Sequence, residues 1–141
     1  MDEEQFIHAV AEQMGVERES AQKIVSAVFR ELHDRLTPRE AADAGAQMPG
    51  GLKRLWAASE FPGRKVKRIH KAEFVKQVSE LAAIPEDEGA RAVRAVFRAL
   101  QALLKSPTGQ EGEAWDILSQ LPKDLKKVWL AAAKPQPAPR P

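Results

Sequence analysis

The residues of this chain best suited to chemistry form a basic run near the middle. The run contains five cations within eight positions: Arg64, Lys65, Lys67, Arg68 and Lys71. Ammonium and guanidinium groups at this density can neutralise phosphates, which gives salt-dependent, sequence-independent binding of nucleic acid. No aromatic residue is interleaved closely enough to stack on bases. The alternative interpretation is a solvated linker that balances the charge of the acidic first half.

The charge of the chain is uneven, and the basic excess is local. The net charge is +2, but residues 1–57 carry −3, residues 58–71 carry +4 and residues 72–141 carry +1. A nucleic-acid interface, if one exists, is therefore predicted on the middle segment and not over the whole surface.

The residue types of the chain give little indication of a metal or cofactor site. The chain has no cysteine, which excludes disulfides and thiolate metal sites. The three histidines, His8, His33 and His70, are not spaced at i, i+3 or i+4 from one another. His8 and His33 align with polar residues of the repeat described below, which favours surface positions. The sequence predicts neither a metal site nor a cofactor.

Catalytic motifs are also absent from the sequence. There is no tyrosine, no glycine-rich phosphate loop and no Gly-x-Ser-x-Gly nucleophile elbow. The periodicity places Glu12, Glu17, Glu31 and Asp34 on the polar sides of helices, where paired buried acids for acid–base work are not expected. We therefore predict that the protein is not an enzyme.

Apolar residues at helical spacing predict the elements that carry these side chains. In the first half, the pattern predicts helices over 4–14, from Glu17 to Leu36, over 41–47 and around 52–56. Thr37-Pro38-Arg39-Glu40 is typical of a capping box with proline in the first helical turn. Residues 58–71, which include the basic run, interrupt the helical pattern and are interpreted as a connector.

The second half repeats this order. Residues 4–36 match residues 72–104 at ten of 33 positions, including Phe29 with Phe97, at an offset of 68. A second block, from Gln47 to Trp56, matches residues 120–129 at an offset of 73. We predict an all-α fold in which two four-helix repeat units pack into one helical bundle with pseudo-two-fold symmetry.

The repeat gives the predicted boundaries and several structural expectations. The first repeat spans 1–57, the connector 58–71, the second repeat 72–131 and a proline-rich, disordered tail 132–141. Trp56 and Trp129 occupy matched positions on apolar stripes and are expected in the core. Matched charges predict an interhelix ion pair in each half: Glu12 with Arg30, and Glu80 with Arg98.

The matched core motifs resemble those of the bacterial domain of unknown function 2267 family. The resemblance rests on the Phe6-x-x-x-Val10 helix, the Ala-Val-Phe-Arg-x-Leu segments and the Gln-Met/Leu-Pro-x-x-Leu-Lys-x-x-Trp segments. It covers nearly the whole chain except the tail. It implies a bacterial, all-helical, double-repeat domain, and it implies no activity and no catalytic residues.

These observations predict a non-enzymatic helical interaction or scaffold module. The acidic start and the lack of an apolar run of roughly 20 residues predict a cytoplasmic protein without a membrane partner. The expected partner is an unidentified protein or a second copy of the chain. The alternative function is association with nucleic acid through the connector.

Overall fold

The predicted all-α fold class is confirmed. The computed structural model describes residues 2–67, 70–104, 112, 116 and 121–133. Within these residues the chain forms seven helices and no strand. They are α1 (Glu3–Met14), α2 (Arg18–His33), α3 (Pro38–Gly45), α4 (Gly50–Ala58), α5 (Lys71–Ala82), α6 (Glu86–Leu104) and α8 (Lys123–Ala131). Most of residues 105–120, where the repeat predicts a counterpart of the helix over 41–47, and the tail residues 134–141 fall outside the described residues.

Local sequence signals set several helix ends. The predicted capping box at Thr37 is confirmed: the Thr37 hydroxyl accepts from the Glu40 N–H at 3.1 Å, and the Glu40 carboxylate accepts from the Thr37 N–H at 2.8 Å. Helix α1 has a second capping box, formed by Asp2 and Gln5. It ends at Gly15, whose φ of 66° lies in the left-handed region that glycine adopts without steric cost.

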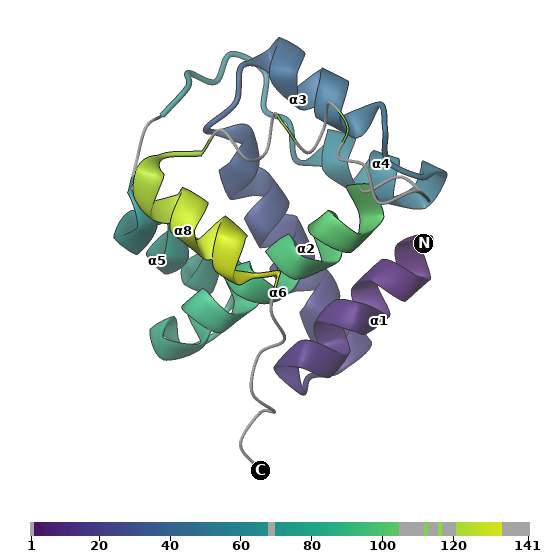
Figure 1. The fold of residues 1–141 in the computed structure, drawn as a ribbon, viewed down its shortest axis with the longest axis vertical. Helices are drawn as coiled ribbons and strands as arrows, with labels where there is room; N and C mark the ends of the chain where they lie inside the picture. Colours follow the sequence, from purple (N-terminus) through teal and green to yellow (C-terminus); the bar gives the residue numbers. More distant parts are fainter. Residues whose placement is uncertain (1, 68–69, 105–111, 113–115, 117–120, 134–141) are drawn as a thin grey trace.

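The two long helices, α2 and α6, form the centre of the molecule (Figure 1). Helix α1 packs against both α2 and α6, and α5 packs against the same two helices. Helices α3 and α4 pack against each other, and α4 also contacts α2. Helix α8 packs on α6. Each half of the chain therefore covers apolar surface of the other half.

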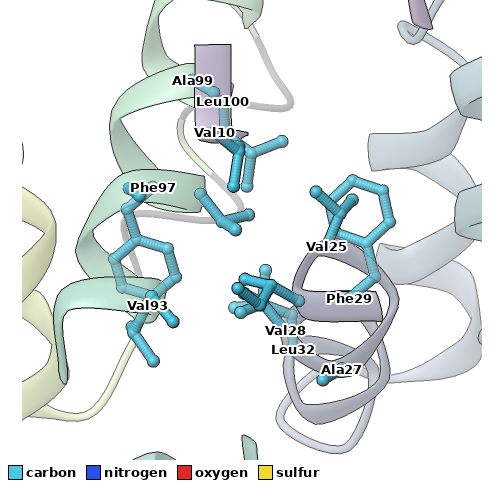
Figure 2. Close-up of a cluster of buried hydrophobic side chains, with 14 of the residues drawn as sticks. Val10, Val25, Ala27, Val28, Phe29, Leu32, Val93, Phe97, Ala99 and Leu100 are labelled. Atoms are coloured by element: carbon cyan, nitrogen blue, oxygen red, sulfur yellow. The ribbon is translucent and has the colours of Figure 1, made fainter. Parts of the chain in front are cut away.

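The core lies between α2 and α6. Figure 2 shows side chains of both helices. Val28 and Leu32 of α2 point toward α6, which carries Phe97 and Leu100. Phe29 and Phe97, which are matched in the repeat, have no exposed surface. Full burial of a large apolar side chain stabilises a fold by about 1.5–3 kcal/mol, so this interface holds the two halves together.

Each central phenylalanine is the middle of a row of three aromatic rings. The Phe29 ring centre lies 6.0 Å from that of Phe6 and 5.0 Å from that of Trp56. The Phe97 ring centre lies 6.2 Å from that of Phe74 and 5.3 Å from that of Trp129. Both tryptophans are at most 2% exposed, which confirms the expectation that they belong to the core.

The predicted interhelix ion pairs are wrong. Glu12 lies 3.2 Å from His8 on its own helix, and Arg30 lies 2.8 Å from Asp34, the residue that caps the end of α2. Arg98 instead donates to the backbone carbonyl of Ala133 at 2.8 Å, beyond the end of α8. Glu12 and Arg30 therefore find partners one helical turn away, and Arg98 reaches a carbonyl at the C-terminal end of α8 instead of a carboxylate.

Candidate functional site

The basic connector contains one cation that serves the fold. The Arg64 side chain is only 4% exposed and forms an ion pair with the Glu60 carboxylate. This hydrogen bond lowers the pKa of Glu60. Arg64 also donates from Nη1 to the carbonyl of Leu36 at 2.6 Å, which fastens the connector to the chain just beyond α2. The charge of Arg64 is therefore paired within the molecule and is not available to bind phosphate.

The other predicted cations are placed differently. Lys65, Lys67 and Lys71 are exposed, and Arg68 lies outside the described residues. The backbone N–H of Lys67 donates to the carbonyl of Asp34 at 2.6 Å, which fixes the backbone at this lysine. The structure thus offers three lysines for phosphate contacts.

A buried polar cluster lies at the end of α2, contrary to the sequence-based expectation. Glu31 and Asp34 were predicted on a polar side, but each is 3% exposed. Helix α5 covers that side of α2: the Arg35 guanidinium carbon lies 4.7 Å from the Phe74 ring centre. With its amide nitrogen turned toward α2, Gln77 of α5 donates to the Glu31 carboxylate.

The Glu31 carboxylate is paired within this cluster. Burial raises the pKa of Glu31, and the nearby Arg35 opposes that rise. Arg35 donates from Nη1 to the backbone carbonyl of Glu31 at 2.6 Å and lies 3.4 Å from its Oε1. The raised pKa therefore reflects burial in an interface. One signal could have located the cluster: at the offset of 68, Glu31 and Arg35 align with apolar Ala99 and Leu103.

His33 is also buried, although it was expected at the surface. It is 1% exposed, its ring centre lies 4.1 Å from that of Trp56, and its Nδ1 is 2.8 Å from the Phe29 carbonyl. Burial lowers the pKa of His33, so the ring is neutral at pH 7 and Nδ1 donates the bond. His8 is exposed, as expected, and His70 is also exposed. Within the described residues, no group of three or more His, Asp or Glu residues could hold a metal ion.

A groove of about 500 Å³ runs along the outer face of α2, and we call it the α2 groove. Its lining consists of Glu19, Gln22, Lys23, Ser26, Ala27, Arg30 and Leu81. Leu81, from α5, is 55% exposed. The Arg30 guanidinium carbon lies 4.3 Å from the ring centre of Phe61, which is 57% exposed. Two large apolar side chains are thus held at the surface in or beside one groove.

The fold and these surfaces define an all-helical protein in which the acidic and imidazole groups buried on α2 are engaged within the fold. Residues 3–128 match the family described as uncharacterized conserved protein (DUF2267), and the chain belongs to that family. The family resemblance in the sequence is thereby confirmed. No curated protein matches the chain. Among the described residues, no helix has the length and apolar character needed to cross a membrane.

Proposed function

We propose that this protein is a non-enzymatic helical interaction module that binds a protein partner through the α2 groove in the bacterial cytoplasm. The observation that supports this function is the exposure of Leu81 and Phe61, at 55% and 57%, in and beside one groove. Large apolar and aromatic side chains at a surface, together with arginine, are typical anchors of protein interfaces. Arg30 links the groove to Phe61 and supplies that charge.

The shape of the groove favours an amphipathic helix as the bound segment. Gln22, Ser26 and Arg30 line it at i, i+4 and i+8 along α2, a distance of about 12 Å at the helical rise. A partner helix laid along this row would bury apolar side chains against Leu81 and Ala27. Glu19 and Lys23 carry opposite charges at one end of the groove, and they would set the direction in which the partner helix binds.

Photo-crosslinking from inside the groove tests this function. A benzoylphenylalanine at Ser26, a half-buried position in the groove, should give a discrete adduct in the native host cells after irradiation. Leu81→Glu should abolish the adduct, because it places a charge among the apolar contacts. The matched control is Leu130→Glu, another exposed leucine (64%) on α8, which should leave the adduct intact.

The mass of the adduct identifies the occupant, since a second copy of this chain and a different protein give different masses. The proposal fails if Ser26 yields no discrete adduct, or if Leu81→Glu and Leu130→Glu reduce it equally. Circular dichroism of each variant separates loss of binding from loss of fold.

The architecture behind this module is proposed to be a doubled four-helix unit with pseudo-two-fold symmetry. The two aromatic rows support this, since Phe6, Phe29 and Trp56 follow the same order as Phe74, Phe97 and Trp129. The reciprocal packing of α1 on α6 and of α5 on α2 also supports it. Proteins built this way often present equivalent surfaces twice, and here the sequences of those surfaces have diverged.

A second candidate function is nucleic-acid association through the connector, favoured by the exposure of Lys65, Lys67 and Lys71. Filter binding at low and moderate salt, on wild type and on a chain with Lys65, Lys67 and Arg68 changed to alanine, tests it. Salt-sensitive binding that the substitutions remove would support this function. Absence of binding by the wild type at low salt would discard it.

A further inference from the structure

A second groove, formed by α5, α6 and α8, lies apart from the α2 groove and has a different chemistry. Its volume is about 440 Å³. We call it the α8 groove, and its lining consists of Lys71, Val75, Ala90, Val93, Arg94, Asp124, Lys127, Val128 and Ala131. The volume falls within the roughly 300–1,000 Å³ that small-molecule sites occupy.

The lining separates into an apolar floor and a cationic rim. Three valines, Val75, Val93 and Val128, come one from each helix, and two alanines add further apolar surface. The cations Lys71, Arg94 and Lys127 also come one from each helix. The exposed lysines Lys71 and Lys127 beside one apolar floor favour a ligand with an apolar body and a negative head, because each part finds a complementary surface.

The single carboxylate in the lining is already engaged. Asp124 accepts from the backbone N–H of Lys71 at 2.7 Å and from its own neighbour Leu125 at 2.9 Å. The Lys71 bond is the main cause of the lowered pKa of Asp124, so the carboxylate is ionised and held in place at neutral pH. Within the described residues, neither the Lys71 nor the Lys127 ammonium forms an ion pair. The rim therefore keeps a net positive charge.

The first half of the chain shows what a carboxylate does at the corresponding place. By the repeat offsets, Glu3 stands where the second half has Lys71, and Gly51 stands where it has Asp124. The Glu3 carboxylate lies so close to Gly51 that a Cβ there would collide with it. The first half therefore has an acid at the start of α1 and a glycine at the start of α4. The second half has a cation at the start of α5 and an acid, Asp124, at the start of α8.

We propose that the α8 groove binds a small amphiphilic anion, an aromatic or acyl carboxylate or its sulfonate equivalent. The hydrocarbon part lies on the valine floor, and the anionic head lies at the side of the groove that carries Lys71 and Lys127. This site is independent of the α2 groove, so failure of the protein-binding function leaves it standing.

Two fluorescent probes with the same ring system test the charge requirement. Anilinonaphthalene sulfonate carries the anion, and phenylnaphthylamine lacks it. Titration of the folded chain should show at least about tenfold tighter binding of the sulfonate, because only it engages the rim. Rising salt should weaken the sulfonate complex and leave the neutral one unchanged.

Variants of the rim and floor locate the site. Lys127→Glu should weaken sulfonate binding by roughly three- to tenfold, since it reverses an exposed charge. The matched control is Lys126→Glu, the adjacent exposed lysine of α8 that does not line the groove, which should bind as wild type. Ala90→Trp fills the groove from an exposed position and should abolish binding of both probes.

Competition by naphthoate and by decanoate then distinguishes a ring from an acyl chain as the preferred body. Displacement of the dye by either one supports the proposal. The proposal is overturned if neither displaces the dye, if both dyes bind equally, or if Lys126→Glu weakens binding as much as Lys127→Glu. Cooperative urea unfolding of every variant excludes dye binding to a loosened core.

Discussion

The Arg35 guanidinium carbon lies 4.7 Å from the centre of the Phe74 ring, and this buried contact joins the chain just after α2 to α5. The same side chain is 3.4 Å from Glu31 Oε1, while its Nε and Nη2 have no hydrogen-bond partner. Removing a guanidinium from water is costly, and a partly satisfied one recovers that cost incompletely. The polar cluster therefore contributes little to the free energy of unfolding.

A double-mutant cycle on Glu31 and Arg35 tests this conclusion. The residues of the second half, Ala99 and Leu103, are the natural replacements at these two positions. Glu31→Ala alone should lower the free energy of unfolding by about 3 kcal/mol, because it leaves Arg35 buried without its carboxylate. Together with Arg35→Leu, the loss should shrink to within about 1 kcal/mol of wild type. Urea denaturation followed by circular dichroism measures all four chains.

Additivity of the two substitutions would contradict the interpretation, since it would mean that the residues stabilise the fold separately. Arg18→Ala is a suitable comparison, because the Arg18 and Glu4 side chains are 49% and 63% exposed and their ion pair is open to solvent. Its loss should shift the urea midpoint less than Glu31→Ala does.

His33 should make stability depend on pH on the acidic side of neutrality. Burial lowers the pKa of His33 below the ordinary value of 6.5, so the unfolded chain takes up a proton before the folded chain does. Stability is therefore full above the unfolded pKa and falls as the pH drops from 6.5 toward the folded pKa, with a slope of at most about 1.4 kcal/mol per pH unit. His33→Gln should flatten that slope. Urea titrations between pH 7.5 and 5 measure it, with values chosen to bracket the ordinary pKa of histidine.

His8→Gln is the control for this experiment, because the His8 side chain is 73% exposed. It should retain the wild-type slope. Burial moves the pKa of Glu31 in the opposite sense, upward, so its contribution to stability declines as pH rises through the folded pKa. The informative quantity is therefore the difference between wild type and His33→Gln. An unchanged slope in that variant would rule out His33 as its source.

Much of the fold follows from the sequence because helix signals are local. The stripe on α2, the capping box at Thr37 and the burial of Phe29 all depend on residues within a few turns of one another. The match between Phe29 and Phe97 added a non-local constraint, because matched apolar positions of the two halves are expected to be buried alike. These predictions concern which face of a helix is apolar, and periodicity reports that directly.

The polar cluster and the grooves could not be predicted in the same way. Glu31 and His33 have polar side chains, and only the packing of α5 and the ring of Trp56 removes them from water. Arg64 was counted as a free cation because its partner Glu60 and its acceptor on Leu36 come together only in the fold. Periodicity describes one helix, whereas a site depends on the helices around it.

Ala83 should be replaceable by glycine with a gain in stability. It ends α5 with φ of 56° and ψ of 46°, the left-handed conformation that Gly15 adopts at the matched end of α1. A side chain in this region costs about 1 kcal/mol, so Ala83→Gly should raise the free energy of unfolding by about that amount. Gly15→Ala should lower it comparably. Ala102→Gly, at an exposed position inside α6, should destabilise and thereby show that glycine itself gives no general benefit.

Gly45 of α3 leaves room for the Trp56 ring of α4. A Cβ at this position would lie 2.6 Å from Cδ1 and 3.0 Å from Nε1 of Trp56, closer than carbon atoms pack. The indole cannot retreat freely, because its N–H donates to the Ala41 carbonyl at 2.8 Å and its ring packs against Phe29 and His33. Gly45→Ala should therefore displace Trp56 and lower the free energy of unfolding by about 1–3 kcal/mol.

The matched control for this prediction is Gly50→Ala at the start of α4, where an added Cβ meets nothing within 4 Å. It should be neutral or slightly stabilising, since alanine is the better helix former. A second measurement separates displacement of the indole from a general loss of stability: the amide and indole N–H signals of Trp56 should shift in Gly45→Ala and stay in place in Gly50→Ala. If Gly45→Ala unfolds at the wild-type urea concentration with an unshifted indole signal, the contact between α3 and α4 is looser than the structure shows.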